Sequence, residues 1–265
     1  MGNIRCGKGR KSFTIQTYPM TPALFKYESL SSTNTELSKL LTDSLPEFSV
    51  VISDYQSEGR GQVGAYWESE RGANLLFSML FYPHFLPVKD FFLLSQFTSL
   101  ALIDFFTRCI PSADFTIKWP NDIYYQDKKI AGILIENSIQ GSQISSSIVG
   151  VGLNVNQTHF VSDAPNPISL ASITGKQYSL STLFDALQFH LHLRYNQLLS
   201  GDLTQIRSDY QRHLYRLGYS SFYEDATGTF EAVLDSVAND GQLCLRLVSG
   251  EQRFYYMKEV KFVID

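Results

Sequence analysis

The chain has 265 residues, of which 44% are hydrophobic and 18% are charged, and its formal net charge is −4. This length permits one large domain, or a large and a small one, around a full hydrophobic core. The composition excludes bulk disorder. The negative charge argues against a protein whose main partner is nucleic acid, without excluding a local basic pocket.

The cysteines and histidines do not form a metal site or a disulfide framework. Cys6, Cys109 and Cys244 are far apart and odd in number, which favours a reducing compartment. His190 and His192 are two residues apart, so on a helix they point to different faces. The basic N-terminus is not followed by the apolar segment of a signal peptide, and no apolar run approaches the roughly 18 residues of a membrane span. We therefore expect a soluble, cytoplasmic protein that binds no metal through its own side chains and does not contact a membrane.

The first helix is predicted from a capping pattern. Thr33 and Glu36 have the spacing of a capping box, and leucines follow at helical intervals. In the simplest interpretation, Ser32, Thr33 and Asn34 only cap this helix. A helix start can equally hold a polar ligand with its hydroxyls and free N–H groups.

A glycine-rich connection, residues 56–74, joins two apolar runs at 48–55 and 75–82 that are predicted to be buried strands. It contains four glycines, two arginines and one of the chain's two tryptophans. Glycines let backbone N–H groups approach a ligand closely, and arginine offers donors that match a carboxylate or a phosphate. The connection therefore predicts an anion site.

The rest of the chain alternates helical and strand patterns. One long, largely buried helix is predicted over residues 89–110, and two further helices over 180–199 and 203–217. Additional strands are predicted over 24–28, 115–118, 130–136 and 144–156. From residue 220 the pattern changes to short strands with turn signals at 226–228, 239–241 and 249–250, which is typical of a small β-barrel.

These patterns predict an α+β protein in three parts. The parts are an N-terminal arm (1–22), a larger domain with a mixed sheet backed by helices (23–218), and a small terminal barrel (219–265). Polar groups concentrate at strand ends, in 32–34, 56–67, 118–136 and 150–156. Each stretch is weak evidence alone, since an isolated lysine is usually a solvated surface group. Together they predict a site for anions and amides, without a Ser-His-Asp or Cys-His nucleophile.

Four motifs, in this order, resemble the signature sequences of biotin–protein ligases. They are Gly59-Arg-Gly-Gln-Val-Gly-Ala-Tyr-Trp67, Lys118-Trp-Pro-Asn-Asp122, Lys129-x-x-Gly-Ile-Leu-x-Glu136 and Gly150-x-Gly-Leu-Asn-x-Asn156. The resemblance extends from about residue 24 to the C-terminus. It implies a class II synthetase-like catalytic domain followed by an SH3-like barrel. Too few residues precede Phe25 to form the winged-helix domain of bifunctional members, so the resemblance implies a monofunctional enzyme that does not bind DNA.

The resemblance also implies a two-step reaction and a set of site residues. Biotin and Mg-ATP would give biotinyl-5′-adenylate and pyrophosphate, and a lysine of a biotin carboxyl carrier protein or domain would then take the biotinyl group. The implied enzyme is a monomer or a weak homodimer. The implied catalytic residues are Lys129, Arg60 and Lys118. The implied biotin-binding residues are Ser32, Thr33, Asn34, Gln56, Gly59, Arg60, Gly61, Gln62, Lys129, Gly132, Leu134 and Gly150. The implied ATP-binding residues are Arg60, Trp67, Lys118, Asn121, Lys129, Asn154 and Asn156, and no residue is assigned as a metal ligand.

The match departs from the family pattern inside the glycine-rich loop. Gln62 and Val63 stand where some members repeat arginine, and Ala65-Tyr66 replaces a basic pair. Arg60 is therefore the one charged residue between Glu58 and Glu68. A lipoate or octanoyl ligase or transferase of similar fold is the nearest alternative, although those proteins lack the Lys-Trp-Pro-Asn-Asp motif. A non-enzymatic ligand-binding or regulatory module is a second alternative, which the presence of both Lys118 and Lys129 disfavours.

Overall fold

The computed structural model describes residues 21–42, 44–62, 66–161 and 166–264. The predicted N-terminal arm lies outside the described residues, apart from its last two positions. Residues 63–65 of the glycine-rich loop also lie outside them, and so do residues 162–165 of a later loop.

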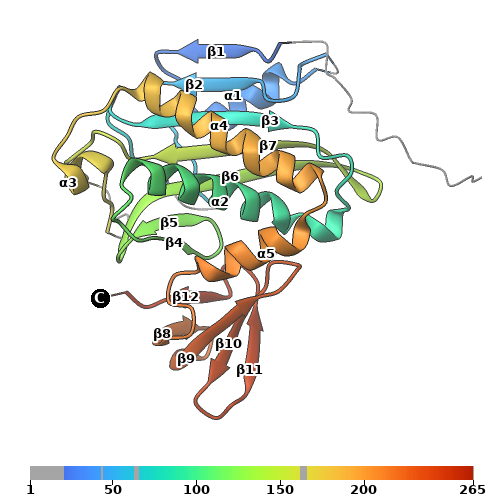
Figure 1. Cartoon of the computed structure of the whole chain (residues 1–265), viewed down its shortest axis with the longest axis vertical. Helices are drawn as coiled ribbons and strands as arrows, with labels where there is room; N and C mark the ends of the chain where they lie inside the picture. Colours follow the sequence, from blue (N-terminus) through green and yellow to red (C-terminus); the bar gives the residue numbers. More distant parts are fainter. Residues whose placement is uncertain (1–20, 43, 63–65, 162–165, 265) are drawn as a thin grey trace, which may run out of the picture.

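The larger sheet has seven strands in the order β1-β2-β3-β7-β6-β5-β4 (Figure 1). Its strands are β1 (Leu24–Tyr27), β2 (Val50–Ser53), β3 (Leu75–Phe81), β4 (Phe115–Lys118), β5 (Asp122–Tyr125), β6 (Lys128–Gln140) and β7 (Gln143–Leu153). β1 and β2 pair in parallel, and every other pair of neighbours is antiparallel. The predicted mixed sheet is confirmed.

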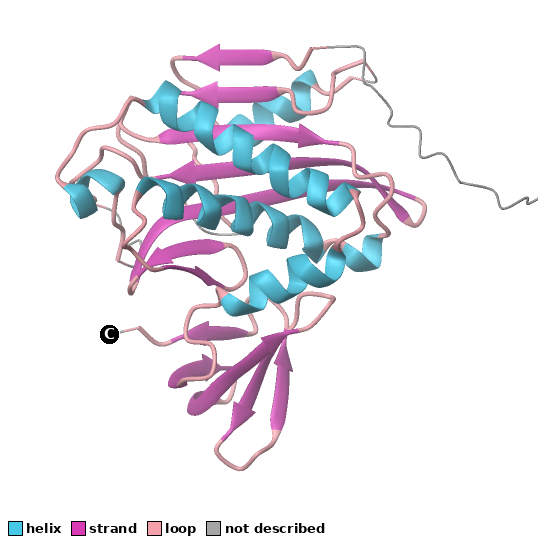
Figure 2. Cartoon of the chain, viewed as in Figure 1, coloured by secondary structure: helices cyan, strands magenta, loops and turns pink. Residues whose placement is uncertain are grey.

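The helices divide between the two faces of this sheet (Figure 2). They are α1 (Thr33–Leu40), the 3₁₀ turn η1 (Val88–Asp90), α2 (Phe92–Cys109), α3 (Leu170–Thr174), α4 (Leu180–Leu199) and α5 (Leu203–Arg212). α2 and α4 cover one face and bury most of the apolar side chains there. α1 packs on the opposite face, where Leu37 contacts a small cluster with Val51, Leu80 and Ile148. Because α1 is short, part of its face of the sheet is left for a cavity.

Alternation along β3 explains the two faces. Phe77, Met79 and Phe81 point into the large core, whereas Ser78 and Leu80 point toward α1. Phe81 anchors an aromatic cluster, with its ring centroid 4.7 Å from that of Tyr195 on α4. Rings at such distances add edge-to-face attraction to their large buried area. The sheet and its helical layer are therefore held by side chains remote from the cavity.

Helix α2 corrects one expectation from the sequence. The segment Val88–Cys109 is long and apolar enough to cross a membrane by length and composition, with a mean hydropathy of 1.2. In the folded chain 72% of its most apolar 18-residue window is buried inside the protein. A core helix meets the same criterion as a membrane span, because both are apolar on every side.

The C-terminal part forms a second, five-stranded antiparallel sheet in the order β11-β10-β9-β8-β12. Its strands are β8 (Ser220–Asp225), β9 (Gly228–Val237), β10 (Leu243–Leu247), β11 (Gln252–Tyr255) and β12 (Val260–Phe262). The predicted change to short strands is confirmed. β11 and β12 stand at the two ends of this order, and the single antiparallel sheet is consistent with the predicted small β domain. The predicted domain boundaries stay predictions.

The turn between β9 and β10 joins the two sheets. Trp119, between β4 and β5, donates its indole N–H to the carbonyl of Gly241 at 2.8 Å. Gly241 has a φ of +91°, and a Cβ there would collide with the ring of Phe92. Only glycine satisfies both constraints at this position. The small sheet is thus docked beside the β4–β5 hairpin.

Four local predictions differ from the structure. The helix predicted to reach residue 217 ends at Arg212, because the following residues pair with β4 through the N–H of Ile117 and the carbonyl of His213. Strand β5 and the short helix α3 were not predicted, and Ser169 caps α3 with its hydroxyl. The predicted capping box is wrong: Ser32 occupies the N-cap of α1, without a capping side-chain hydrogen bond, and Thr33 is already helical.

Two buried tyrosines provide a test of core hydrogen bonding. The hydroxyl of Tyr195 donates to the buried carboxylate of Glu47 at 2.7 Å, whereas the equally buried hydroxyl of Tyr210 has no partner among the described residues. We expect Tyr195→Phe to lower the free energy of unfolding by about 1–2 kcal/mol, because Glu47 loses a donor. Tyr210→Phe should be neutral or slightly stabilising. Urea unfolding of both variants checks this, and equal losses would contradict it.

Candidate functional site

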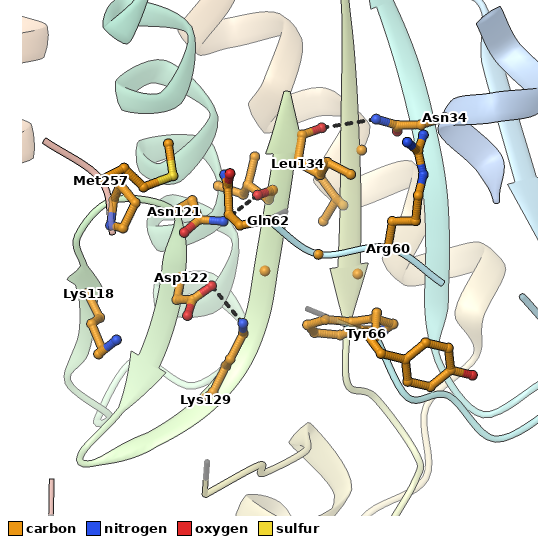
Figure 3. Close-up of a pocket in the computed structure, with 18 of the residues that line it drawn as sticks. Asn34, Arg60, Gln62, Tyr66, Lys118, Asn121, Asp122, Lys129, Leu134 and Met257 are labelled. Atoms are coloured by element: carbon orange, nitrogen blue, oxygen red, sulfur yellow. Dashed lines mark hydrogen bonds and ion pairs between the residues drawn. The ribbon is translucent and has the colours of Figure 1, made fainter. Parts of the chain in front are cut away.

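A cavity of about 310 Å³ opens on the α1 face of the larger sheet, beside the C-terminal sheet (Figure 3). Six segments line it: the start of α1, the glycine-rich loop, the β4–β5 hairpin, β6, β7 and the region from Met257 to Phe262. Its volume lies in the range of small-molecule sites. The motifs quoted from the sequence are far apart in the chain, and the fold brings parts of all four to this cavity.

Most of the residues predicted for the site line this cavity. They are Ser32, Thr33, Asn34, Gln56, Arg60, Gly61, Gln62, Trp67, Lys118, Asn121, Lys129, Gly132, Leu134 and Gly150. Their predicted roles toward biotin and ATP remain proposals.

Three predicted site residues do not line it: Gly59, Asn154 and Asn156. Gly59 accepts a hydrogen bond from the N–H of Trp67 at 2.8 Å and closes the base of the loop. Asn154 is buried beyond the end of β7, and its amide donates to the carbonyl of Ile168. Asn156 uses both ends of its amide on the backbone of Tyr178, at 2.9 Å each. Both asparagine side chains hold a loop through these hydrogen bonds. Neither side chain lies at the cavity, where the predicted contact with a nucleotide would be made.

One end of the cavity is a network of neutral polar groups. The Oε1 atom of Gln56 accepts from the backbone N–H of Thr33 at 2.7 Å and from its hydroxyl at 3.1 Å. The hydroxyl of Ser78 lies 2.8 Å from that of Thr33 and 2.5 Å from Oδ1 of Asn34. These groups come from α1, the loop and β3, and nearly all are buried. We call this the amide end of the cavity; it suits a ligand head with its own donors and acceptors.

Three glycines make the floor of the cavity flat. Gly132 and Gly152 are cross-strand partners on β6 and β7, and the indole of Trp67 lies against both. A Cβ at Gly152 would collide with that indole, and a Cβ at Gly150 would collide with the amide of Asn34. The glycines therefore let two side chains pack directly on the backbone of the sheet. The indole N–H of Trp67 is buried without a partner among the described residues, which leaves a donor at the cavity.

Lys129 lies at the other end of the cavity, which we call the lysine end. Its Nζ atom is 2.7 Å from Oδ1 of Asp122 and 5.4 Å from the centroid of a ring of Trp67. The pair joins β6 to the β4–β5 hairpin, and Figure 3 shows the two side chains facing each other. Sequence reasoning missed Asp122 as a site residue, although it belongs to the Lys-Trp-Pro-Asn-Asp motif.

A β-bulge determines which face Lys129 occupies. Strict alternation from Lys129 predicts that its side chain shares the face of Ala131 and Ile133. The register between β5 and β6 shifts between Ile123 and Tyr124, so the pairing passes over Ile130. As a result Lys129 lies beside Gly132 on the cavity face, while Ala131 and Ile133 enter the core. The predicted alternation is wrong here, because bulges re-aim side chains next to sites.

Lys118 completes the lysine end. Its Nζ atom lies 5.4 Å from the ring centroid of Tyr124 and 5.0 Å from that of Phe262. Burial among these rings lowers the pKa of the Lys118 ammonium below its ordinary 10.5, and the Asp122 carboxylate opposes this shift in part. Lys118 is therefore largely desolvated, which differs from the solvated surface lysine that an isolated lysine in a sequence usually represents.

Arg60 lies at the amide end, remote from both lysines (Figure 3). Its Nη2 atom is 3.0 Å from Oε2 of Glu136. The sequence interpretation placed Arg60 over the ligand and its phosphates together. In this structure its guanidinium is directed toward Asn34 and away from Lys118, so the predicted phosphate contact would need the side chain to move.

Several lining residues were not predicted. They are Tyr66, Trp119, Pro120, Asp122, Ile133, Val151, Gly152, Met257, Lys258, Val260, Lys261 and Phe262. The first seven belong to the quoted motifs or to strands beside them. The last five come from the C-terminal sheet, and no sequence signal connects them to the cavity. They appear only because the second sheet docks beside the β4–β5 hairpin.

The lining is strongly basic although the chain is acidic. Among the described residues that line the cavity, five carry positive charge and Asp122 carries the one carboxylate. The five are Arg60, Lys118, Lys129, Lys258 and Lys261. Basic groups converging in a concave site attract multiply charged anions. The cavity can therefore hold a neutral polar head at one end and anionic groups at the other.

Comparisons with known proteins agree with this arrangement. Residues 27–154 match the Biotin/lipoate A/B protein ligase family. The chain is 26% identical over 248 residues to the Bifunctional ligase/repressor BirA of Bacillus subtilis, covering 92% of this chain and 75% of that protein. It is 29% identical over 228 residues to the Biotin–[acetyl-CoA-carboxylase] ligase of Paracoccus denitrificans, covering 83% of this chain and 93% of that protein.

Solved structures support the same fold. The biotin protein ligase of Aquifex aeolicus in complex with biotin and ATP aligns with a TM-score of 0.77 at 22% identity, over 91% of this chain and 99% of that one. The biotin protein ligase of Leishmania major in complex with biotinyl-5-AMP aligns with a TM-score of 0.60 at 20% identity, over 90% of this chain and all of that one. At these identities the likeness concerns the fold. Together with the quoted motifs, the family match places a domain of the biotin/lipoate A/B protein ligase family at residues 27–154 of this chain.

Proposed function

We propose that the chain is a biotin–protein ligase that activates biotin with ATP and transfers the biotinyl group to a lysine of a biotin carboxyl carrier protein or domain. The observation that carries the proposal is the division of one cavity into an amide end and a lysine end. Biotin has a neutral ureido ring at one end and a carboxylate at the other, which matches this division. The named relatives and the aligned complexes support the same assignment.

The proposed chemistry has two balanced steps. A carboxylate oxygen of biotin attacks the α-phosphorus of ATP, and the bond to the bridging oxygen breaks to release pyrophosphate. The neutral ε-amine of the acceptor lysine then attacks the acyl carbon of the adenylate. An amide forms, AMP leaves, and the amine loses a proton. Because carboxylate and phosphate carry like charge, the first step needs positive charge between them.

At the amide end, Thr33, Asn34 and Gln56 would bind the ureido group. Their hydroxyl and amide groups are already oriented by one another and by Ser78, so these side chains would lose little conformational freedom on binding. Trp67 and the glycines of β6 and β7 would pack against the apolar ring and chain. This placement would also favour binding of biotin over lipoate, because the dithiolane ring of lipoate offers no matching hydrogen-bonding groups.

At the lysine end, Lys129 would bridge the biotin carboxylate and the α-phosphate. The ion pair with Asp122 holds its ammonium at the cavity before substrates bind. Once an anionic substrate arrives, Lys129 would exchange or share that partner. An interaction that strengthens as charge develops on the α-phosphate favours the transition state over the ground state.

The nucleotide would extend from Lys129 toward Lys118, Asn121 and the C-terminal sheet. Lys258 and Lys261, which line this side of the cavity, add positive charge near the phosphates. For Mg²⁺, Asp122 is the one carboxylate in the described lining, and one carboxylate with phosphate oxygens is a common environment for this ion. When bound, Mg²⁺ would neutralise phosphate charge.

One assay tests the proposed function against its alternatives. The chain is incubated with ATP and either biotin or lipoate, and pyrophosphate and the acyl-adenylate are measured. Biotin-dependent pyrophosphate release is expected, followed by biotinylation of an acceptor when a biotin carboxyl carrier domain is added. Lipoate-dependent release would favour the lipoate alternative, and binding of biotin without pyrophosphate release would favour a non-enzymatic module.

The cellular setting remains part of the proposal. Both described cysteines, Cys109 and Cys244, are free thiols, which supports a reducing compartment such as the cytoplasm. The carrier domain follows from the proposed reaction and from the names of the relatives.

Lys129 and its neighbour Lys128 form a matched pair for testing catalysis. Lys129→Ala should lower the single-turnover rate of adenylate formation by roughly 10²–10³-fold, because it removes positive charge aimed at the reacting groups. Biotin affinity should change far less. Lys128 begins the same strand but is exposed and does not line the cavity, so Lys128→Ala should leave the rate unchanged. Similar modest effects of the two substitutions would contradict the assignment.

The lowered pKa of Lys118 predicts the pH dependence of nucleotide use. Burial makes its ammonium lose the proton at a lower pH than the ordinary 10.5, and the neutral amine no longer attracts phosphate. The kcat/KM for ATP should therefore decline on the alkaline side before an ordinary lysine deprotonates. Lys118→Arg keeps the charge at any accessible pH, so its decline should move to higher pH. An unchanged profile in Lys118→Arg would show that another group causes the decline.

A further inference from the structure

Glu136 joins two parts of the site that are far apart in the chain. It lies on β6, two residues beyond Leu134, and does not line the main cavity itself. Its Oε2 atom accepts from the amide of Asn34 at 2.7 Å and lies 3.0 Å from Nη2 of Arg60. One carboxylate oxygen thus links the start of α1 with the base of the glycine-rich loop. Neither the matched motif nor the proposed reaction explains this contact.

The contact determines how the Asn34 amide is oriented. An ionised carboxylate accepts hydrogen bonds and donates none, so Asn34 must present its NH₂ group to Glu136. The carbonyl of Leu134 lies 3.3 Å from the same nitrogen and imposes the same orientation. The Oδ1 atom of Asn34 is then turned to the hydroxyl of Ser78 at the amide end. A glutamine at position 136 could donate as well as accept, so the longer contact to the Leu134 carbonyl alone would then select this orientation.

The same carboxylate keeps the Arg60 side chain at the amide end. The main chain of Arg60 pairs with Tyr66 across the base of the loop, next to the hydrogen bond between Trp67 and Gly59. Arg60 is 45% exposed and Glu136 is 41% exposed, so their pair contributes little to the stability of the fold. Its consequence is local, because it ties the loop base to β6 beside Asn34.

The pair also borders a second cavity. Arg60 lines both the main cavity and a second one of about 370 Å³, and Glu136 lines the second. The second cavity lies along α1 and the outer part of β6, with Lys39 and Asn137 on its sides. Arg60 is thus shared by the two cavities at the amide end, and Glu136 contacts it from the side of the second cavity.

We propose that Glu136 is a positioning residue for the ligand head: it orients the Asn34 amide and holds Arg60 as the end wall of the binding cavity. The proposal rests on the proposed function, in which that head is the ureido ring of biotin. Glu136 acts through its two partners and does not touch the reacting atoms. Its loss should therefore affect biotin binding and leave the chemical step unaffected.

The test measures biotin affinity without ATP and adenylation at saturating biotin. Glu136→Gln should weaken biotin binding about tenfold, the size expected for one lost charge-assisted hydrogen bond. The adenylation rate at saturation and the KM for ATP should stay within about twofold of the wild type, since the lysine end is untouched. Glu136→Asp, which keeps the charge on a shorter stem, should recover part of the affinity.

A double-variant cycle tests whether Arg60 and Glu136 act together. Arg60→Gln should weaken biotin binding in the same way. The double variant should bind biotin at least as tightly as whichever single variant has the lower biotin affinity. Glu36→Gln is the matched control, because Glu36 is a carboxylate on α1 that pairs with Lys39 and does not line the cavity. Its biotin affinity should equal that of the wild type. Circular dichroism and thermal unfolding verify that each variant folds, and exposed Arg60 provides the test if Glu136→Gln does not fold.

Three outcomes would overturn the proposal. One is wild-type biotin affinity in Glu136→Gln. Another is a loss that falls on the adenylation rate or on the KM for ATP. A third is additive losses in the double variant. A wild-type chain that binds no biotin would instead overturn the proposed function, so the two failures are distinguishable.

Discussion

The packing of the Trp67 indole on Gly132 and Gly152 is the contact on which the site depends. The two glycines face each other across β6 and β7, so the indole reaches the backbone of the sheet itself. This contact brings the end of the glycine-rich loop onto the sheet and places the aromatic face beside Lys129. Any larger residue at either glycine would lift the indole, and with it the loop. The cavity therefore requires glycine, which has no side chain, at these two positions of the sheet.

The cavity separates hydrogen bonding from charge. At the amide end, hydroxyl and amide groups satisfy one another through short, mostly buried contacts, which preserves their orientation when no ligand is bound. At the lysine end, Lys129 and Lys118 are partly withdrawn from solvent, with Asp122 as the nearby counter-charge. Withdrawal from solvent strengthens their action on an anion, because the local dielectric is lower than that of water. Recognition and charge neutralisation can then be handled by different residues.

Both sheets contribute to the site, and their contact is specific. The indole of Trp119 and the ring of Phe92 hold the turn at Gly241. This docking brings Phe262 against Lys118 and adds Lys258 and Lys261 to the basic wall. The small sheet is thus more than an appended module, since it completes the side of the cavity assigned to the nucleotide. Substitutions at the docking contact are expected to affect the lysine end as well as stability.

Local sequence patterns were sufficient to predict much of the secondary structure and many residues of the site. Apolar periodicity located most helices and strands, and the order of polar motifs identified the family and most cavity-lining residues, because these features depend on neighbouring residues in the chain. Tertiary structure decided the rest. The bulge at Ile130 turned Lys129 to the cavity face, pairing with β4 ended α5 early, and loop contacts drew Asn154 and Asn156 away from the cavity. The partnership of Glu136 with Asn34 and Arg60, and the wall supplied by the second sheet, join residues far apart in sequence. Such contacts depend on sheet register and docking, which no local pattern encodes.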